Sequence, residues 1–151
     1  MFELIFSDRL DSEHELMRAA ELIDWDGLHE TLGRYYSPRG RSGKPIRMMV
    51  GIHILKHRYN CSDERAVEEL RENAYWQYFC GFNSFQVGQI LEASSLVKFR
   101  NRIETEGMQL IDVRLQMVLD KLDQNLRDSF RTHIHLYCLF SKFQNAIFLP
   151  S

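Results

Sequence analysis

The sequence predicts an all-α fold, a compact domain of several helices, from three observations. Apolar residues recur at the three- and four-residue spacing of an α-helix over much of the chain. Residues that favour helix ends flank these stretches, among them Asp24 and Ser62 at helix starts and Gly81 at a helix end. The chain has 151 residues and a hydrophobic content of 44%, which is enough to bury the core of one domain.

The expected helices follow one another with short connections. In chain order they cover residues 13–23, a short stretch after Asp24, and residues 45–60, 63–72, 74–80, 96–104 and 108–126. The helix over residues 45–60 has apolar residues on two overlapping stripes, so we expect it to be buried at the centre of the domain. We place this domain at residues 1–118. Residues 119–151 are expected to form a helical extension and an irregular tail, for which the pattern predicts no definite structure.

Three helix ends are predicted from single residues. Ser12 and Glu15 fit the capping box, in which each side chain accepts a hydrogen bond from the other residue's backbone, so the first helix is expected to start at residue 13. Ser94 or Ser95 is expected to cap the helix over residues 96–104. Gly107 is expected to separate that helix from the next one.

Charge is distributed unevenly along the chain. The net charge of −2 and the pI of about 6.3 do not by themselves indicate a nucleic-acid-binding protein. Between Arg34 and Arg58, however, there are seven basic residues and no acidic one, whereas residues 1–33 hold nine acids and two bases. Such a block gives the surface one positive region that attracts phosphate. Its middle part, the basic arm from Arg39 to Arg47, includes an expected loop rich in Gly, Pro and Ser.

The helix over residues 96–104 has a polar face with Lys98, Asn101 and Arg102, and Arg100 lies beside it. Arginine and asparagine make paired hydrogen bonds to guanine and adenine edges in a major groove. An ordinary solvated helix face is the other interpretation. The pattern of residues 45–72 alone resembles a helix-turn-helix, in which residues 63–72 would be the recognition helix. That helix is too acidic to enter a groove of DNA. We therefore expect a helix-turn-helix-like arrangement whose recognition helix is residues 96–104.

Other chemistry is weakly indicated. His53, His57 and Cys61 recur on one helical face at the spacing of zinc ligands, but no fourth ligand is evident, and ordinary helix residues are the simpler interpretation. No phosphate-binding glycine loop, nucleophile elbow or zinc-protease motif occurs. We therefore expect no catalytic residue, no metal and no cofactor on this chain.

The compartment is inferred from the cysteines and from two missing patterns. The three cysteines show no CxxC spacing, which favours a reducing compartment. No apolar run is long enough for a membrane span, and the N-terminus does not have the pattern of a signal peptide. A cytoplasmic protein without a membrane partner is expected.

Several strings resemble one family. They are IDWD at 23–26, YSPRGR at 36–41, PIRMMVG at 45–51, LKH at 55–57, YWQYFCG at 75–81 and SSLVKFR at 94–100. Over about Leu10 to Leu115 the chain resembles the N-terminal domain of bacterial insertion-sequence transposases of the InsH type. The resemblance implies a helical domain that binds the terminal inverted repeats of the element. It also implies a following RNase H-like domain whose Asp, Asp, Glu triad binds divalent metal and cuts and joins DNA.

Two features depart from the family. Glu92 and Ala93 stand where the family shows Asp-Pro before the two serines. The sequence after about Val118 does not resemble the approach to a catalytic domain, and none of its carboxylates has the expected strand context. We therefore expect a transposase truncated or frameshifted before its catalytic domain, with residues 128–151 outside the ancestral reading frame, and no catalysis by this chain alone.

The sequence thus predicts a DNA-binding protein whose partners are double-stranded inverted-repeat ends and a second copy of itself or an intact transposase. The predicted DNA-binding residues are Arg39, Arg41, Lys44, Arg47, Arg58, Lys98, Arg100, Asn101 and Arg102. The alternative is a protein-interaction or oligomerisation module without sequence-specific DNA binding. That alternative rests on the apolar stripe of the helix over residues 108–126, which could bind a partner.

Overall fold

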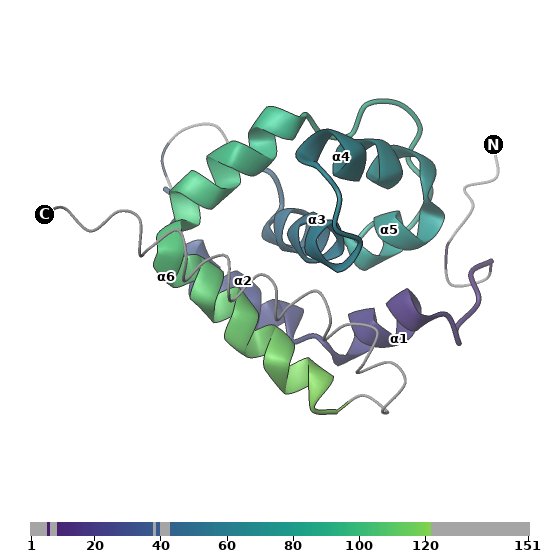
Figure 1. Ribbon diagram of the computed structural model, residues 1–151, viewed down its shortest axis with the longest axis horizontal. Coiled ribbons are helices and arrows are strands. Elements are labelled where there is room, and N and C mark those ends of the chain that lie inside the picture. The colour runs from purple at the N-terminus through teal and green to yellow at the C-terminus, as the bar shows by residue number, and fades with distance from the viewer. Residues whose placement is uncertain (1–5, 7–8, 38, 40–42, 122–151) are drawn as a thin grey trace, which may run out of the picture.

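The computed structural model describes residues 6, 9–37, 39 and 43–121. These residues form six α-helices and no β-strand, so the predicted all-α class is confirmed (Figure 1). The helices are α1 (Glu15–Leu22), α2 (Trp25–Gly33), α3 (Ile46–Arg58), α4 (Asp63–Glu72), α5 (Ala74–Phe79) and α6 (Ala93–Leu119). Residues 122–151 lie outside the described part of the chain, so the domain division at residue 118 stays a prediction.

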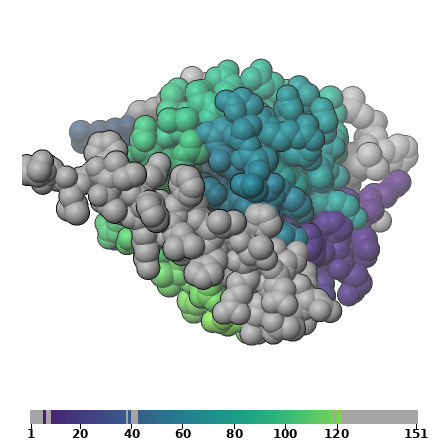
Figure 2. Space-filling model, in the orientation of Figure 1, coloured from purple at the N-terminus to yellow at the C-terminus, as the bar shows by residue number. Residues whose placement is uncertain are grey.

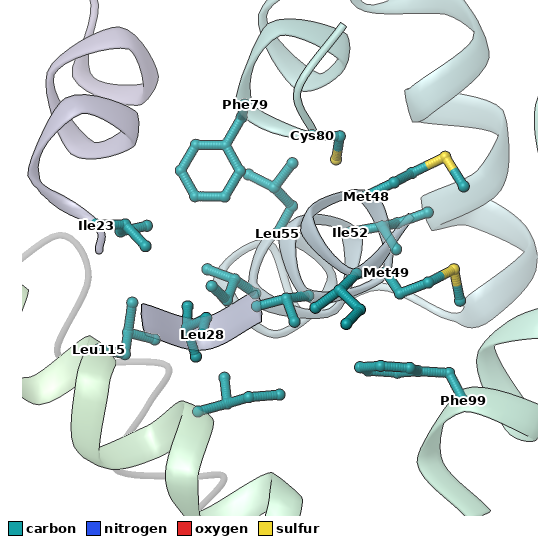
Figure 3. Packing of buried hydrophobic residues seen from close by; sticks show 14 of the residues in the cluster. Ile23, Leu28, Met48, Met49, Ile52, Leu55, Phe79, Cys80, Phe99 and Leu115 are labelled. Carbon is teal, nitrogen blue, oxygen red and sulfur yellow. The ribbon is translucent and has the colours of Figure 1, made fainter. Parts of the chain in front are cut away.

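The predicted central helix is confirmed as α3. Helices α2, α4, α5 and α6 all pack against it. Val50, Ile52 and Leu55 are completely buried, because neighbours cover α3 on almost every side. In Figure 3 the labelled side chains of α5 and of both ends of α6 point toward this helix, with Phe79 on one side and Phe99 and Leu115 on the other. One continuous core therefore joins all six helices.

Two predicted caps are confirmed. Asp24 Oδ1 accepts a hydrogen bond from the backbone NH of Gly27 at 2.9 Å and starts α2. Ser62 Oγ accepts from the NH of Arg65 at 3.1 Å and starts α4 at the predicted residue. Each satisfies a backbone donor that a helix start would otherwise leave unpaired.

The capping box at Ser12 was a wrong prediction. Helix α1 starts at Glu15, and His14 is its N-cap, with Nδ1 accepting from the NH of Leu16 at 3.2 Å. The imidazole of His14 stacks on the ring of Tyr75, with centroids 3.7 Å apart. Since Tyr75 belongs to α5, the residue that caps α1 also makes a tertiary contact, which a local motif does not contain.

Helix α6 differs from the prediction of two helices separated at Gly107. It runs from Ala93 to Leu119 and bends at Glu104, whose φ of 55° and ψ of −170° are not helical. Figure 1 shows the bend clearly, and we call residues 93–103 and 105–119 the N-terminal and C-terminal segments of α6. Gly107 does not end a helix: a Cβ there would lie 2.6 Å from Ile103 Cβ, so glycine permits close packing after the bend.

The start of α6 was also mispredicted. The N-cap is Glu92, without a side-chain hydrogen bond, so Ser94 and Ser95 lie in the first turn instead of capping it. The helical period predicted that the apolar residues of the N-terminal segment face the core, and this is confirmed: Leu96, Phe99 and Ile103 are buried.

The C-terminal segment of α6 uses most of its apolar stripe within the domain. Met108, Ile111, Leu115 and Val118 are buried in the common core. The described part of the stripe is therefore largely taken up by the core of the domain, whereas the Leu119 and Leu122 side chains lie outside the described part, and the predicted partner stays a prediction. Among the described residues, no helix has the length and apolarity needed to cross a membrane.

Candidate nucleic-acid interface

Several residues of the basic block pair with carboxylates inside the domain. Arg34 lies 2.8 Å from Glu106 on α6. Arg58 Nη2 lies 2.5 Å from Glu15 Oε1, and the Arg58 side chain is only 8% exposed. Because this guanidinium is covered and neutralised, we leave Arg58 out of the proposed interface.

Arg47 is held in a similar way, although by different partners. Its guanidinium carbon lies 4.7 Å from the centre of the Trp25 ring, and Nη2 donates to the carbonyl of Tyr78 at 3.5 Å. The side chain also packs against Gly81, where a Cβ would lie 2.7 Å from Arg47 Cδ. Burial lowers the pKa of Arg47. This arginine therefore joins α2, α3 and α5, and only part of it faces solvent.

Arg100 clamps two helices together. Its Nη1 and Nη2 donate to the two carboxylate oxygens of Asp63 at 3.0 and 2.7 Å. These bonds hold the pKa of Asp63 below its usual value. Figure 2 shows the two helices concerned, α4 and the N-terminal segment of α6, side by side on one face. A fork that already binds a carboxylate in this way is not available for a guanine edge.

Lys44, Lys98 and Arg102 remain, and they meet at one cleft of about 730 Å³. The cleft lies between the loop that precedes α3, the loop that precedes α6, and the N-terminal segment of α6. All three residues are exposed, and none of them forms an ion pair within the described part of the chain. Glu92 is the acidic residue in the lining, so the cleft has a positive balance.

Tyr36 positions the Arg102 side chain in this cleft. The guanidinium carbon of Arg102 lies 4.6 Å from the centre of the Tyr36 ring, within the range of a cation–π contact. A Cβ on Gly43 would lie 2.8 Å from Tyr36 Cε1 and 3.0 Å from Arg102 Nη1. Only glycine therefore lets the loop approach this pair so closely. Burial raises the pKa of Tyr36, so its hydroxyl stays protonated at neutral pH.

The remaining predicted residues are placed as follows. Lys44 Nζ donates to the carbonyl of Ile90 at 3.4 Å, which ties the basic arm to the loop before α6. Arg39 is exposed in the loop between Tyr36 and Gly43, both of which line the cleft. Asn101 is exposed on α6 next to Arg102, and Arg41 lies outside the described residues. The sequence prediction missed Tyr36, because its contact with Arg102 leaves no local signal.

The candidate zinc ligands do not come together as a site. The rings of His53 and His57 lie 4.4 Å apart, but Cys61 Sγ is directed to the carbonyl of Lys56 at 3.9 Å. Burial lowers the pKa of His57 to about 4, with nearby Lys56 and Arg100 adding to the effect. Within the described ranges, no group of three His, Cys, Asp or Glu side chains could hold a metal ion.

Comparison with known proteins gives two matches. Residues 4–102 match the model of a family described as "Transposase domain (DUF772)". A protein of Rhizobium meliloti described as "Uncharacterized protein ORF8 in nfe locus" is 42% identical over 109 residues, which are 70% of this chain and 53% of that protein. The chain therefore spans about half the length of this relative. No solved structure matches the chain.

Proposed function

We propose that this chain, which belongs to the transposase domain family DUF772, is the DNA-binding part of an insertion-sequence transposase. The observation that supports this most directly is the cleft, where Lys44, Lys98 and Arg102 converge without a carboxylate partner among the described residues. Cations without a carboxylate partner, on a chain with a net charge of −2, create a local positive potential that attracts a phosphate backbone.

The proposed contacts divide between two elements. Arg39, Arg41 and Lys44 in the basic arm bind phosphates, which position the protein on the duplex. Lys98, Asn101 and Arg102 on the N-terminal segment of α6 approach base edges, and from the groove the charges of Lys98 and Arg102 also offset those of neighbouring phosphates. In this helix-turn-helix-like arrangement α3 and α4 are the scaffold, and the Arg100–Asp63 clamp fixes the angle of the recognition helix.

The proposed target is the terminal inverted repeats of the mobile element, and cutting and joining belong to Asp, Asp and Glu residues of a separate catalytic domain. Support comes from the family, whose description names a transposase domain. The proposed partners at these ends are an intact transposase or a second copy of this chain. A function on chromosomal DNA places it in the cytoplasm.

Fluorescence anisotropy tests the proposal. A labelled duplex copied from the inverted repeats that flank the gene is titrated with the full chain, with a random duplex as competitor. We expect binding that weakens steeply as salt rises and that the random duplex displaces poorly. Equal displacement by both duplexes would refute sequence-specific binding, and an anisotropy that does not change at any salt concentration would refute DNA binding altogether.

A further inference from the structure

The loop between α5 and α6 is anchored by a buried side chain. Gln77 of α5 is completely buried. Its Nε2 donates to the carbonyl of Gln86 at 3.0 Å, and its Oε1 accepts from the backbone NH of Gln86 at 2.7 Å. A buried amide must satisfy its hydrogen bonds, and Gln77 does so by holding the backbone of this loop at one point.

The tip of the loop follows directly after this anchor. The Gln86 side chain donates to the carbonyl and the hydroxyl of Ser84 at 3.1 and 3.2 Å, which closes the base of the turn. Val87 comes next and is 91% exposed, more than any other large hydrophobic side chain of the described residues. Gly88 has a φ of 97° and no neighbour within 4 Å of its Cβ position, so the tip turns in open space.

The same loop leads into the basic cleft. Gln89 and Ile90 line the cleft together with Lys98 and Arg102. Lys44 Nζ bonds to the carbonyl of Ile90, so the loop is held on the cleft side as well. Gln89 follows Val87 by two positions in the chain, so the Cα atoms of the two residues lie at most about 7 Å apart. In Figure 1 the loop arches outward from the helices between α5 and α6.

We propose that this loop, residues 84–90, is a second DNA-contacting element in which Val87 packs against sugars and base edges in a groove of the duplex bound by α6. The inference rests on the proposed function. A single exposed valine is ordinary on a protein surface. Val87, however, lies at the most exposed point of its loop. The loop is held by the buried Gln77 on one side and by Lys44 of the cleft on the other, so it presents Val87 for contact with a partner.

The chemistry suits a nucleic-acid groove. An apolar side chain contacts the methyl group of thymine or the sugar edges, which phosphate-binding cations do not reach. Because the loop is already held at Gln86 and Ile90, it gives up little conformational freedom when it binds. The neighbouring Gln89 supplies a side-chain amide that can bond to base edges.

The test replaces Val87 by serine in the full chain. The control is Val113→Ser, which changes a valine that is 60% exposed on the C-terminal segment of α6. Both variants and the wild type are titrated with the inverted-repeat duplex at several salt concentrations. We expect Val87→Ser to weaken binding by about fivefold to tenfold without changing the salt dependence, because every phosphate-binding cation remains in place. Val113→Ser is expected to bind like the wild type.

The outcomes separate this inference from the function on which it rests. If the wild type binds in a salt-dependent manner and Val87→Ser binds equally well, the contact made by the loop is refuted and the proposed function is not. A change in salt slope for Val87→Ser would also refute the loop contact, because the weaker binding would then involve phosphates. If the wild type binds no duplex at all, the proposed function and this inference both fail.

Discussion

Replacing Lys98 and Arg102 together by alanine tests whether the cleft is the surface that binds phosphate. Both side chains are exposed and face the same cleft, so the double variant removes two cations without opening the core. Inside the domain, the substitution of Arg102 removes its stacking on Tyr36, which is a surface interaction. The helical fold is therefore expected to survive, and circular dichroism checks this.

The expected magnitude follows from counting phosphates. If Arg39, Arg41, Lys44, Lys98 and Arg102 each neutralise one phosphate charge, the logarithm of affinity falls with the logarithm of salt with a slope of about −4.5. Removing two of the five reduces the slope to about −2.7. A roughly fourfold rise in salt then weakens the wild type about 500-fold and the double variant about 40-fold.

Arg65 and Arg71 on α4 provide the matched control. Both are exposed and pair with glutamates of their own helix, away from the cleft. Replacing both by alanine lowers the net charge by the same two units, so a general effect of net charge appears equally in both double variants. Anisotropy titrations over a salt series measure the slopes. A cleft variant that keeps the wild-type slope, or a control whose slope falls as much, would refute the assignment of phosphate contacts to the cleft.

Three further predictions concern stability. Asp63→Asn removes the charged bonds to Arg100 and is expected to lower the free energy of unfolding by about 1–2 kcal/mol at pH 7. Arg100 lowers the pKa of Asp63 in the folded protein. The stabilisation by this ion pair is therefore fully present above the pKa of an unfolded carboxyl and is lost as the pH falls through the pKa of the folded protein. In urea denaturation, the difference between Asp63→Asn and the wild type should shrink as the pH is lowered into the acid range. Burial lowers the pKa of His57 to about 4, so the unfolded chain binds this proton first. His57 should therefore contribute a fall of about 3 kcal/mol in the free energy of unfolding between pH 6.5 and 4, in addition to the fall caused by the buried His53, whose pKa is also lowered. His57→Gln should make the decline shallower by its own share, and an equally steep decline in the variant would contradict the reasoning. Glu104→Gly should raise the free energy of unfolding by roughly 1 kcal/mol, and with it the thermal midpoint, because glycine adopts a φ of 55° without strain. A lower thermal midpoint would contradict this prediction.

Much of the helical layout could be predicted because its signals are local. The apolar period over residues 45–60 predicted a buried central helix, and α3 has that place. Asp24 and Ser62 cap the helices that follow them because an N-cap bonds to a backbone NH only two or three residues away. Predictions failed where a distant residue decides the outcome. His14, not Ser12, is the N-cap of α1, and its ring stacks on Tyr75 of α5. Gly107, which was expected to end a helix, instead lies close to Ile103 and to Tyr35, which follows α2 in the chain.

The candidate interface shows the same division. The sequence by itself determined the excess of positive charge between Arg34 and Arg58 and the polar face of the helix over residues 96–104. Only the tertiary structure decided which of those charges remain available. Glu15 pairs with Arg58, and Asp63 pairs with Arg100, so each cation already has a carboxylate partner inside the domain. Long side chains pair with whichever carboxylate packing brings near, and no local spacing specifies that neighbour.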